Sequence, residues 1–338
     1  MTTPHVLVIG AGSVGRRHLR NFAALGCRVA AMDPRADRLD EAHREVALTQ
    51  ADTTLEAALA HAVGCDGVVV ASPPSFHVAQ CTAALERGLP VLLEKPVSPT
   101  LAEASHLATV VRQSGRPLLL GYTYRWWPPL QRFRERLQQG EIGRVLHVRC
   151  VMSAHLADWH PWERYQDFFM ASAALGGGAL LDESHFIDLM LWIFGEPSSV
   201  WGHMSRLSSL EIETDDNVDA VMRYGAGPTV SIHLDLFGRP HEKHIVAVGE
   251  TGTLHWSFEP NQIRLGRKDS QHWQDETFAH ERNDMFTGVA REFMDIIAGD
   301  GSPSCTIEDG CAVMRVIEAV RESTRRGLAI TLEGHHSR

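Results

Sequence analysis

Six residues near the start of the chain, Gly10-Ala11-Gly12-Ser13-Val14-Gly15, have the spacing of a loop that binds a pyrophosphate. They directly follow the apolar run 5–9 and open an amphipathic stretch. In such a loop the first glycine permits a tight turn, the second lets backbone approach the phosphates, and the third allows close helix packing. The helix N-terminus then supplies N–H donors and a positive dipole. The pattern predicts dinucleotide binding.

An acidic residue follows at the position where a dinucleotide site needs one. Asp33 ends the next apolar run, 28–32, eighteen positions after Gly15. A carboxylate there can accept hydrogen bonds from the adenosine ribose hydroxyls and repels a 2′-phosphate, which favours NAD over NADP. Arg35 lies two residues later and can reach such a phosphate, so NADP stays open.

Two polar residues interrupt an apolar stretch in the second half of the chain. Residues 179–194 predict one helix, buried through its leucines and aromatic residues. Asp182 and His185 stand three apart, so we expect them to share one helical face and to meet a substrate or each other. Asp188, three residues further on, is interpreted as structural. A histidine in an apolar helix is often a core residue, which is the alternative for His185.

Aromatic and polar residues alternate in the segment 158–165. Trp159, Trp162 and Tyr165 can stack on the apolar faces of a sugar, and His160 can hydrogen-bond its hydroxyls. A surface loop packed on its own domain explains the same residues equally well. Further polar candidates for a substrate are Tyr124 and Arg125, which either face a cleft or brace it.

Alternating short apolar runs and helical patterns precede residue 123. The predicted strands are 6–9, 28–32, 67–71, 91–94 and 117–120, with helices such as 14–25 and 78–87 between them. This alternation is typical of βαβ units, so we expect an α/β Rossmann domain with a doubly wound parallel sheet over residues 1–123. Lys95 then follows a strand at the sheet edge where ligands bind.

The pattern changes in residues 124–338, which we expect to form an α+β domain for substrate binding and oligomerisation. Period-two alternation predicts strands at 145–151, 218–224, 229–236 and 244–248, and a turn at 249–252. These strands predict a large, mainly antiparallel sheet, with helices 284–297 and 307–325 covering one face. The substrate is expected between the two domains.

Composition restricts the class of partner. The formal charge of −10 disfavours nucleic acid, whose binding needs clustered Lys and Arg. No apolar stretch approaches the roughly 20 residues of a membrane span. The cysteines lack metal-type spacing, and the histidines form no metal motif, so we predict no metal and a cytoplasmic protein.

The order of these motifs resembles the glucose-fructose oxidoreductase, inositol dehydrogenase and rhizopine-catabolism (Gfo/Idh/MocA) family over essentially the whole chain. The residues that carry the resemblance are the glycine loop, 71–77, Glu94-Lys95-Pro96, Tyr124-Arg125, and Gly176-Gly177-Gly178 leading into Asp182 and His185. Many members separate that aspartate and histidine by four positions and this chain by three, so His185 ranks above Asp182.

The resemblance implies an NAD(P)-dependent dehydrogenase that acts on a sugar, a cyclitol or a sugar derivative. It implies that Lys95 steadies the developing alkoxide, that His185 is the general base and that Asp182 orients it. Pro96 is expected to follow a cis peptide bond. The cofactor contacts that it implies, beyond the glycine loop and Asp33, are Ser72, Pro73, His77, Glu94 and Lys95.

Two other functions remain open for this fold. One is a redox-neutral glycosidase that keeps NAD bound, and the other is a non-catalytic, nicotinamide-binding regulatory protein. The presence of both Lys95 and His185 argues against the regulator. We also expect a homodimer or homotetramer, because relatives often bury one face of such a sheet against a second subunit.

Overall fold

A computed structural model describes residues 3–61, 64–159 and 163–332, which form two compact units. Unit 1 comprises the described residues of 1–123 together with 282–314, and unit 2 those of 124–281 and 315–338. Residues 282–314 therefore belong to unit 1, whereas the sequence pattern placed them in the second domain.

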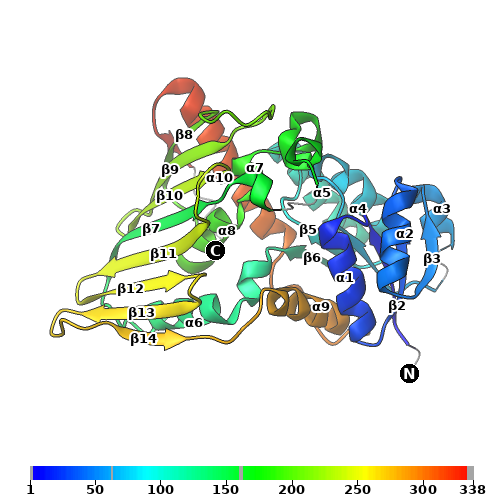
Figure 1. Cartoon of the computed structure of the whole chain (residues 1–338), viewed down its shortest axis with the longest axis horizontal. Helices are drawn as coiled ribbons and strands as arrows, with labels where there is room; N and C mark the ends of the chain where they lie inside the picture. The colour runs from blue at the N-terminus through cyan, green and yellow to red at the C-terminus, as the bar shows by residue number, and fades with distance from the viewer. Residues whose placement is uncertain (1–2, 62–63, 160–162, 333–338) are drawn as a thin grey trace. The chain divides into compact units, whose positions relative to one another are not determined.

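Unit 1 contains a six-stranded parallel sheet in the order β3-β2-β1-β4-β5-β6 (Figure 1). This order belongs to the doubly wound dinucleotide-binding fold, so the predicted α/β class is confirmed. From β1 the successive strands extend the sheet to one side as β2 and β3 and then to the other side as β4, β5 and β6, so the loops after the parallel neighbours β1 and β4 lie side by side. The strands are β1 (His5–Ile9), β2 (Arg28–Met32), β3 (Leu48–Asp52), β4 (Gly67–Val70), β5 (Val91–Glu94) and β6 (Leu118–Gly121).

The central strands are apolar throughout because helices cover both faces of the sheet. All residues of β1 and β4 are buried. Strand β3, at the edge, has a half-exposed and polar sequence, which explains why the apolar pattern missed it. The helices of unit 1 are α1 (Ser13–Ala24), α2 (Ala36–Glu45), α3 (Leu55–His61), η1 (Pro74–Phe76), α4 (His77–Leu85), α5 (Leu101–Ser114) and α9 (Asn283–Ala298), with the first part of α10 (Ile307–Arg326).

Helix α9 returns from late in the chain to pack on unit 1. The ring of Phe293 lies 6.1 Å from that of Phe22 on α1, centroid to centroid. It also lies within about 3 Å of the place that a Cβ on Gly67 would occupy. The prediction that helix 284–297 covers the antiparallel sheet is therefore wrong, because its apolar face completes the core of unit 1.

Unit 2 contains a nine-stranded sheet in the order β14-β13-β12-β11-β7-β10-β9-β8-β15 (Figure 1). Neighbours are antiparallel except β7 and β10, which run parallel, so the predicted mainly antiparallel sheet is confirmed. The strands are β7 (Val145–Ser153), β8 (Ser199–Ser205), β9 (Asn217–Arg223), β10 (Thr229–Asp235), β11 (Glu242–Gly249), β12 (Gly252–Ser257), β13 (Gln262–Arg267), β14 (Gln274–Thr277) and β15 (Ile330–Thr331).

One face of this sheet is covered by helices and the other is polar. Val230, Ile232 and Leu234 of β10 point to the covered face and are buried. Val320 of α10 lies against Gly202 of β8, so this last part of α10 covers the sheet as predicted for helix 307–325. The remaining helices of unit 2 are η2 (Thr123–Trp126), α6 (Pro128–Gln138), η3 (Leu156–Asp158), η4 (Tyr165–Asp167), η5 (Phe169–Ala171), η6 (Ala173–Leu175), α7 (Ala179–Asp182) and α8 (His185–Phe194).

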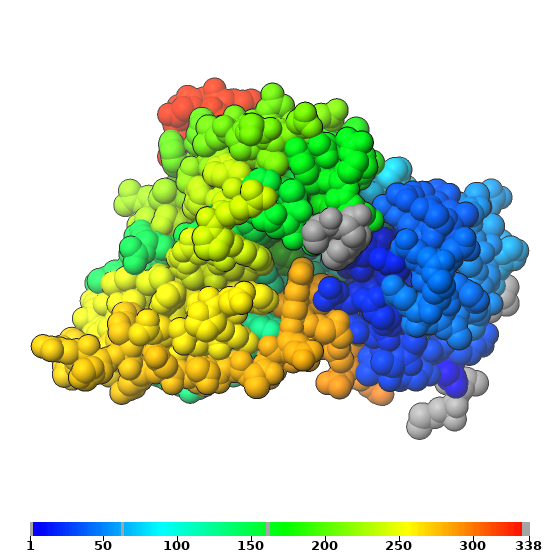
Figure 2. All heavy atoms as spheres, in the orientation of Figure 1, coloured from blue at the N-terminus to red at the C-terminus, as the bar shows by residue number. Residues whose placement is uncertain are grey.

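Strands β12 to β14 form one end of the sheet, coloured yellow to orange in the space-filling view (Figure 2). Within the described ranges, no helix is both long enough and apolar enough to cross a membrane.

Candidate active site

The glycine loop of unit 1 has the shape that a bound dinucleotide requires. Gly10 has φ +92°, and a Cβ there would lie 2.7 Å from the backbone of Ala71. A Cβ on Gly15 would lie 1.7 Å from the carbonyl oxygen of Gly10. At Gly12 the nearest atom to such a Cβ is 3.7 Å away, on Arg38. The loop is thus closely packed at its two ends and open at Gly12, where a pyrophosphate can approach the backbone.

Asp33 holds this loop in place. Its side chain is almost fully buried, and Oδ2 accepts a hydrogen bond from the backbone N–H of Ala11 at 2.8 Å. Oδ1 accepts another from the N–H of Arg35 at 2.9 Å. Each carboxylate oxygen has a second lone pair, so Asp33 can accept ribose hydroxyls as well. The residues present are therefore compatible with an adenosine ribose at this position.

Two arginines lie near Asp33, and sequence reasoning named one of them. The Arg35 side chain binds Asp37 and lowers the pKa of that exposed carboxyl. The residue that sequence reasoning missed is Arg38, whose Nη1 lies 3.8 Å from Asp33 Oδ2. Its position in the first turn of α2, five residues after Asp33, is the signal that could have identified it. Arg38 is thus the arginine closer to the candidate ribose site.

The loop after β4 lies against the glycine loop, since a Cβ on Gly10 would lie 2.7 Å from Ala71 and Ser72. Ser72 Oγ donates to Gln80 Oε1 at 2.6 Å, and Pro73 precedes η1. His77 is fully buried, with its ring nitrogens 2.8 Å from the carbonyl oxygens of Ser72 and Pro96. The structure therefore places His77 between two loops of unit 1. Its contact with the cofactor stays a prediction.

Glu94, Lys95 and Pro96 lie at the carboxyl end of β5. Glu94 is buried, and its Oε1 is 2.7 Å from Nε2 of His18 on α1. Lys95 is half-buried. The peptide bond between Lys95 and Pro96 is cis, as predicted. The strand end thus fixes the backbone around Lys95.

The predicted helix 179–194 is interrupted, so that prediction is wrong. Helix α7 ends at Asp182, and α8 begins at His185. Glu183 leaves helical geometry at ψ 18°, and Ser184 Oγ donates to the carbonyl oxygen of Leu181 at 2.8 Å. Such a side-chain bond competes with the helical ladder. The three-residue spacing therefore does not by itself place Asp182 and His185 on one helical face.

His185 lies in a small cluster of unit 2. The centroid of its ring is 4.7 Å from that of Tyr124. Lys243 Nζ on β11 donates to the Tyr124 hydroxyl oxygen at 2.6 Å. Sequence reasoning missed Lys243. The signal that could have identified it is the scarcity of lysine, because the chain has only three: Lys95, Lys243 and Lys268. The cluster brings a cation, a phenol and an imidazole together.

Arg125 braces this cluster from inside the fold. Its Nε and Nη2 donate to the two carboxylate oxygens of Asp188 at 3.0 and 2.7 Å. Both side chains are buried, with exposed fractions of 6% and 0%. This buried pair is compatible with a bracing role for Arg125 and a structural role for Asp188, and both roles stay predictions.

The aromatic segment is only partly described. His160 and Trp162 lie outside the described residues. Trp159 is half-buried, and the Tyr165 hydroxyl accepts from the N–H of Glu211 at 3.3 Å. Asp158 forms an exposed ion pair with Arg239, which lowers the pKa of Asp158. These contacts tie the segment to unit 2, and its role in sugar binding stays a prediction.

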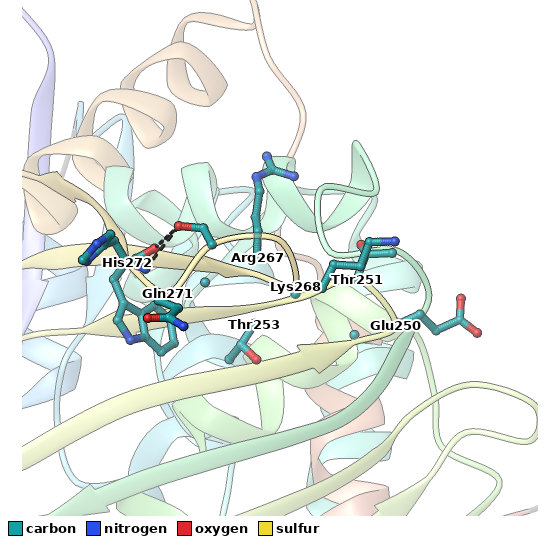
Figure 3. A pocket seen from close by; sticks show the side chains of 12 residues that line it. Glu250, Thr251, Thr253, Arg267, Lys268, Gln271 and His272 are labelled. Carbon is teal, nitrogen blue, oxygen red and sulfur yellow. Dashed lines mark hydrogen bonds between the residues drawn. The ribbon is translucent and has the colours of Figure 1, made fainter.

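A shallow hollow of about 400 Å³ lies at the turn between β11 and β12 (Figure 3). Lys243 is the second residue of the same strand β11 that ends at this turn, so the hollow lies at the opposite end of the strand. Arg267 and Glu250 extend away from each other in Figure 3 rather than converging. The hollow is therefore not the candidate active site.

The fold and the glycine loop define an NAD(P)-binding protein of the Rossmann class. Residues 5–122 match the model of an oxidoreductase family with an NAD-binding Rossmann fold, and residues 130–255 match a GFO/IDH/MocA C-terminal domain. Inositol 2-dehydrogenase 1 of Saccharopolyspora erythraea is 30% identical over 75% of this chain and 73% of its own length. The chain belongs to the Gfo/Idh/MocA family of oxidoreductases.

A second relative and a solved structure are also similar to this chain. The inositol 2-dehydrogenase of Streptomyces avermitilis is 32% identical over 56% of this chain, and the match spans 53% of that protein. Among solved structures, levoglucosan dehydrogenase in complex with NADH has a TM-score of 0.88 at 19% identity, covering 98% of this chain and 100% of the other. This likeness supports the fold.

Proposed function

We propose that this protein is an NAD(P)-dependent oxidoreductase that transfers a hydride between nicotinamide and a secondary alcohol or ketone of a sugar, cyclitol or sugar derivative. The observation that carries the proposal is the loop architecture of unit 1, with an open Gly12 and with Lys95 at a neighbouring strand end. The relatives named inositol 2-dehydrogenase support the substrate class.

In this proposal, side chains of the protein accept the proton and stabilise the developing charge. The bound nicotinamide supplies the hydride-accepting group. His185 accepts the hydroxyl proton of the alcohol, and Asp182 assists by orientation or by binding a hydroxyl. The Lys95 ammonium stabilises the alkoxide as the proton leaves. Tyr124, Trp159 and Tyr165 bind the sugar, with Lys243 holding the Tyr124 hydroxyl.

NAD is the proposed preferred cofactor. The buried Asp33 carboxylate supports this preference, because a carboxylate beside the adenosine ribose repels a 2′-phosphate. The side chain of Arg35 is bound to Asp37. Arg38 is the residue that would admit NADP. The ratio of kcat/KM for NAD to that for NADP is expected to rise in Arg38→Ala and to fall in Asp33→Ala. A fall in both variants would contradict this assignment.

We further propose a homo-oligomer formed through the polar face of the nine-stranded sheet. Trp201 on β8 is 42% exposed, and it is paired in register with the half-buried Val221 on β9. Aromatic residues such as tryptophan are enriched in protein interfaces relative to the rest of the surface. Sedimentation at micromolar concentration is expected to give a dimer or tetramer, and Trp201→Asp should shift it toward monomer. A wild-type monomer would refute this proposal.

The central experiment follows absorbance at 340 nm with NAD or NADP and a panel of sugars, inositols and sugar acids. We expect a rise with one substrate class and a loss of turnover of at least a hundredfold in Lys95→Ala and in His185→Ala. Lys268→Ala and His106→Ala, both at exposed positions, are the matched controls. Full turnover in folded, cofactor-bound Lys95→Ala and His185→Ala would overturn the mechanism. Sugar hydrolysis without net NADH would indicate a glycosidase.

A further inference from the structure

Two fully buried histidines contact the residues on either side of Lys95. His77 is the first residue of α4, and its Nδ1 lies 2.8 Å from the carbonyl oxygen of Pro96. Its Nε2 lies 2.8 Å from the carbonyl oxygen of Ser72, in the loop after β4. Its imidazole therefore connects the segment that follows Lys95 to a neighbouring loop.

Glu94, the residue before Lys95, contacts the second buried histidine, His18. His18 on α1 is 0% exposed, and its Nε2 lies 2.7 Å from Oε1 of Glu94. The rings of Phe22 and Phe286 pack against this imidazole, with centroids 6.3 and 5.9 Å away. Both partners of the contact are thus fixed by the core of unit 1.

We propose that His18 and His77 are positioning residues that set the place of the Lys95 ammonium, His18 through Glu94 and His77 through the Pro96 carbonyl. This inference rests on the proposed function, in which Lys95 stabilises the alkoxide. Lys95 is half-buried and directly follows β5, so a shift of the backbone at Glu94 or Pro96 moves the base of its side chain. A misplacement of about 1 Å of a catalytic group can lower a rate on the order of a hundredfold.

Two substitutions of His77 distinguish its contact with Pro96 from its contact with Ser72. The amide nitrogen of Asn lies about where Nδ1 of His does, and that of Gln about where Nε2 does. The neutral imidazole donates through only one of its two nitrogens, whereas His77→Asn places an N–H donor toward Pro96 and His77→Gln places one toward Ser72. If His77 acts through Pro96, His77→Asn retains kcat within a few-fold, and His77→Gln loses it on the order of tenfold to a hundredfold.

The measurements are kcat and KM with the sugar or inositol that gives turnover, and Kd for NADH from its fluorescence. In His77→Gln and in His18→Leu we expect kcat to fall by a larger factor than the Kd for NADH rises. The control is His106→Leu, at an exposed position of α5, with kcat unchanged. Equal kcat in the Asn and Gln variants, or a Kd that worsens as much as kcat, would overturn the proposal.

A double-mutant cycle separates this inference from the proposed function. If His77 acts through Lys95, His77→Gln has no further effect on the residual turnover of Lys95→Ala. If the double variant instead loses turnover by the product of the two single losses, the two residues act independently and the inference is overturned. Full turnover in Lys95→Ala would instead refute the role of Lys95, and the inference with it. If Lys95→Ala is inactive but His77→Gln keeps full kcat, only the positioning role fails.

Discussion

The two sheets of this protein carry functional residues in different ways. In unit 1 every residue of β1 and β4 is buried, so ligand-binding groups gather in the loops at the strand ends. In unit 2 the candidate residues Tyr124, His185 and Lys243 come from a 3-10 helix, a helix and a strand, and they meet through side-chain contacts. The first arrangement depends on backbone shape, and the second depends on buried polar pairs.

The largest expected effect tests the dependence of unit 2 on a buried ion pair. Asp188→Ala leaves the 6% exposed Arg125 guanidinium without its bidentate partner. We expect the free energy of unfolding to fall by about 3–5 kcal/mol, measured by urea titration.

The matched control is Glu196→Ala, which removes the partner of Arg315 in a more exposed pair. That change is expected to cost about 1 kcal/mol or less. If Asp188→Ala is no more destabilising than Glu196→Ala, unit 2 does not depend on the buried pair.

The second prediction tests backbone shape in unit 1. Gly12 has room for a Cβ and an ordinary φ of −70°, so Gly12→Ala should leave the melting temperature nearly unchanged. The added methyl group occupies the approach of the pyrophosphate, so the Kd for NADH should rise about tenfold or more, about 1.4 kcal/mol.

Gly15→Ala provides the contrast, because its Cβ would overlap the Gly10 carbonyl. This variant should lose both stability and binding. A Gly12→Ala protein that binds NADH like the wild type would show that the open position is not the phosphate site.

The smallest effect concerns the polar face of the second sheet. His233 on β10 is hydrogen-bonded to Asp235 and Asp219, and these bonds raise its pKa from 6.5 to about 9. A raised folded-state pKa stabilises the fold fully below pH 6.5, and this contribution is lost as the pH rises through about 9. Because His233 is 36% exposed, solvent screening reduces the contribution to about 1 kcal/mol or less.

The free energy of unfolding of wild type and His233→Gln measures this contribution. The difference between them should be larger at pH 6 than at pH 10. A difference that grows with pH would reverse the sign and contradict the assignment.

The difference between loops at strand ends in unit 1 and side-chain contacts in unit 2 also explains how much of the site could be predicted from the sequence. The loops of unit 1 follow short apolar strands in chain order, so the glycine loop, Asp33 and Lys95 could be placed at strand ends from local pattern alone. The pairs in unit 2 join distant residues, such as Tyr124 with Lys243, and no local period encodes such contacts. Helical periodicity likewise continued through Ser184, whose hydroxyl bond to the backbone interrupts the helix.

Helix α9 has a consequence for synthesis of the chain. All strands from β7 to β14 leave the ribosome before Phe293, which packs against Phe22 and beside Gly67 in unit 1. The Rossmann sheet therefore waits for α9 until most of the polypeptide has been made. A nascent chain that stops at residue 123 exposes the apolar surface that α9 later covers, which makes this stage the natural point for a chaperone to act.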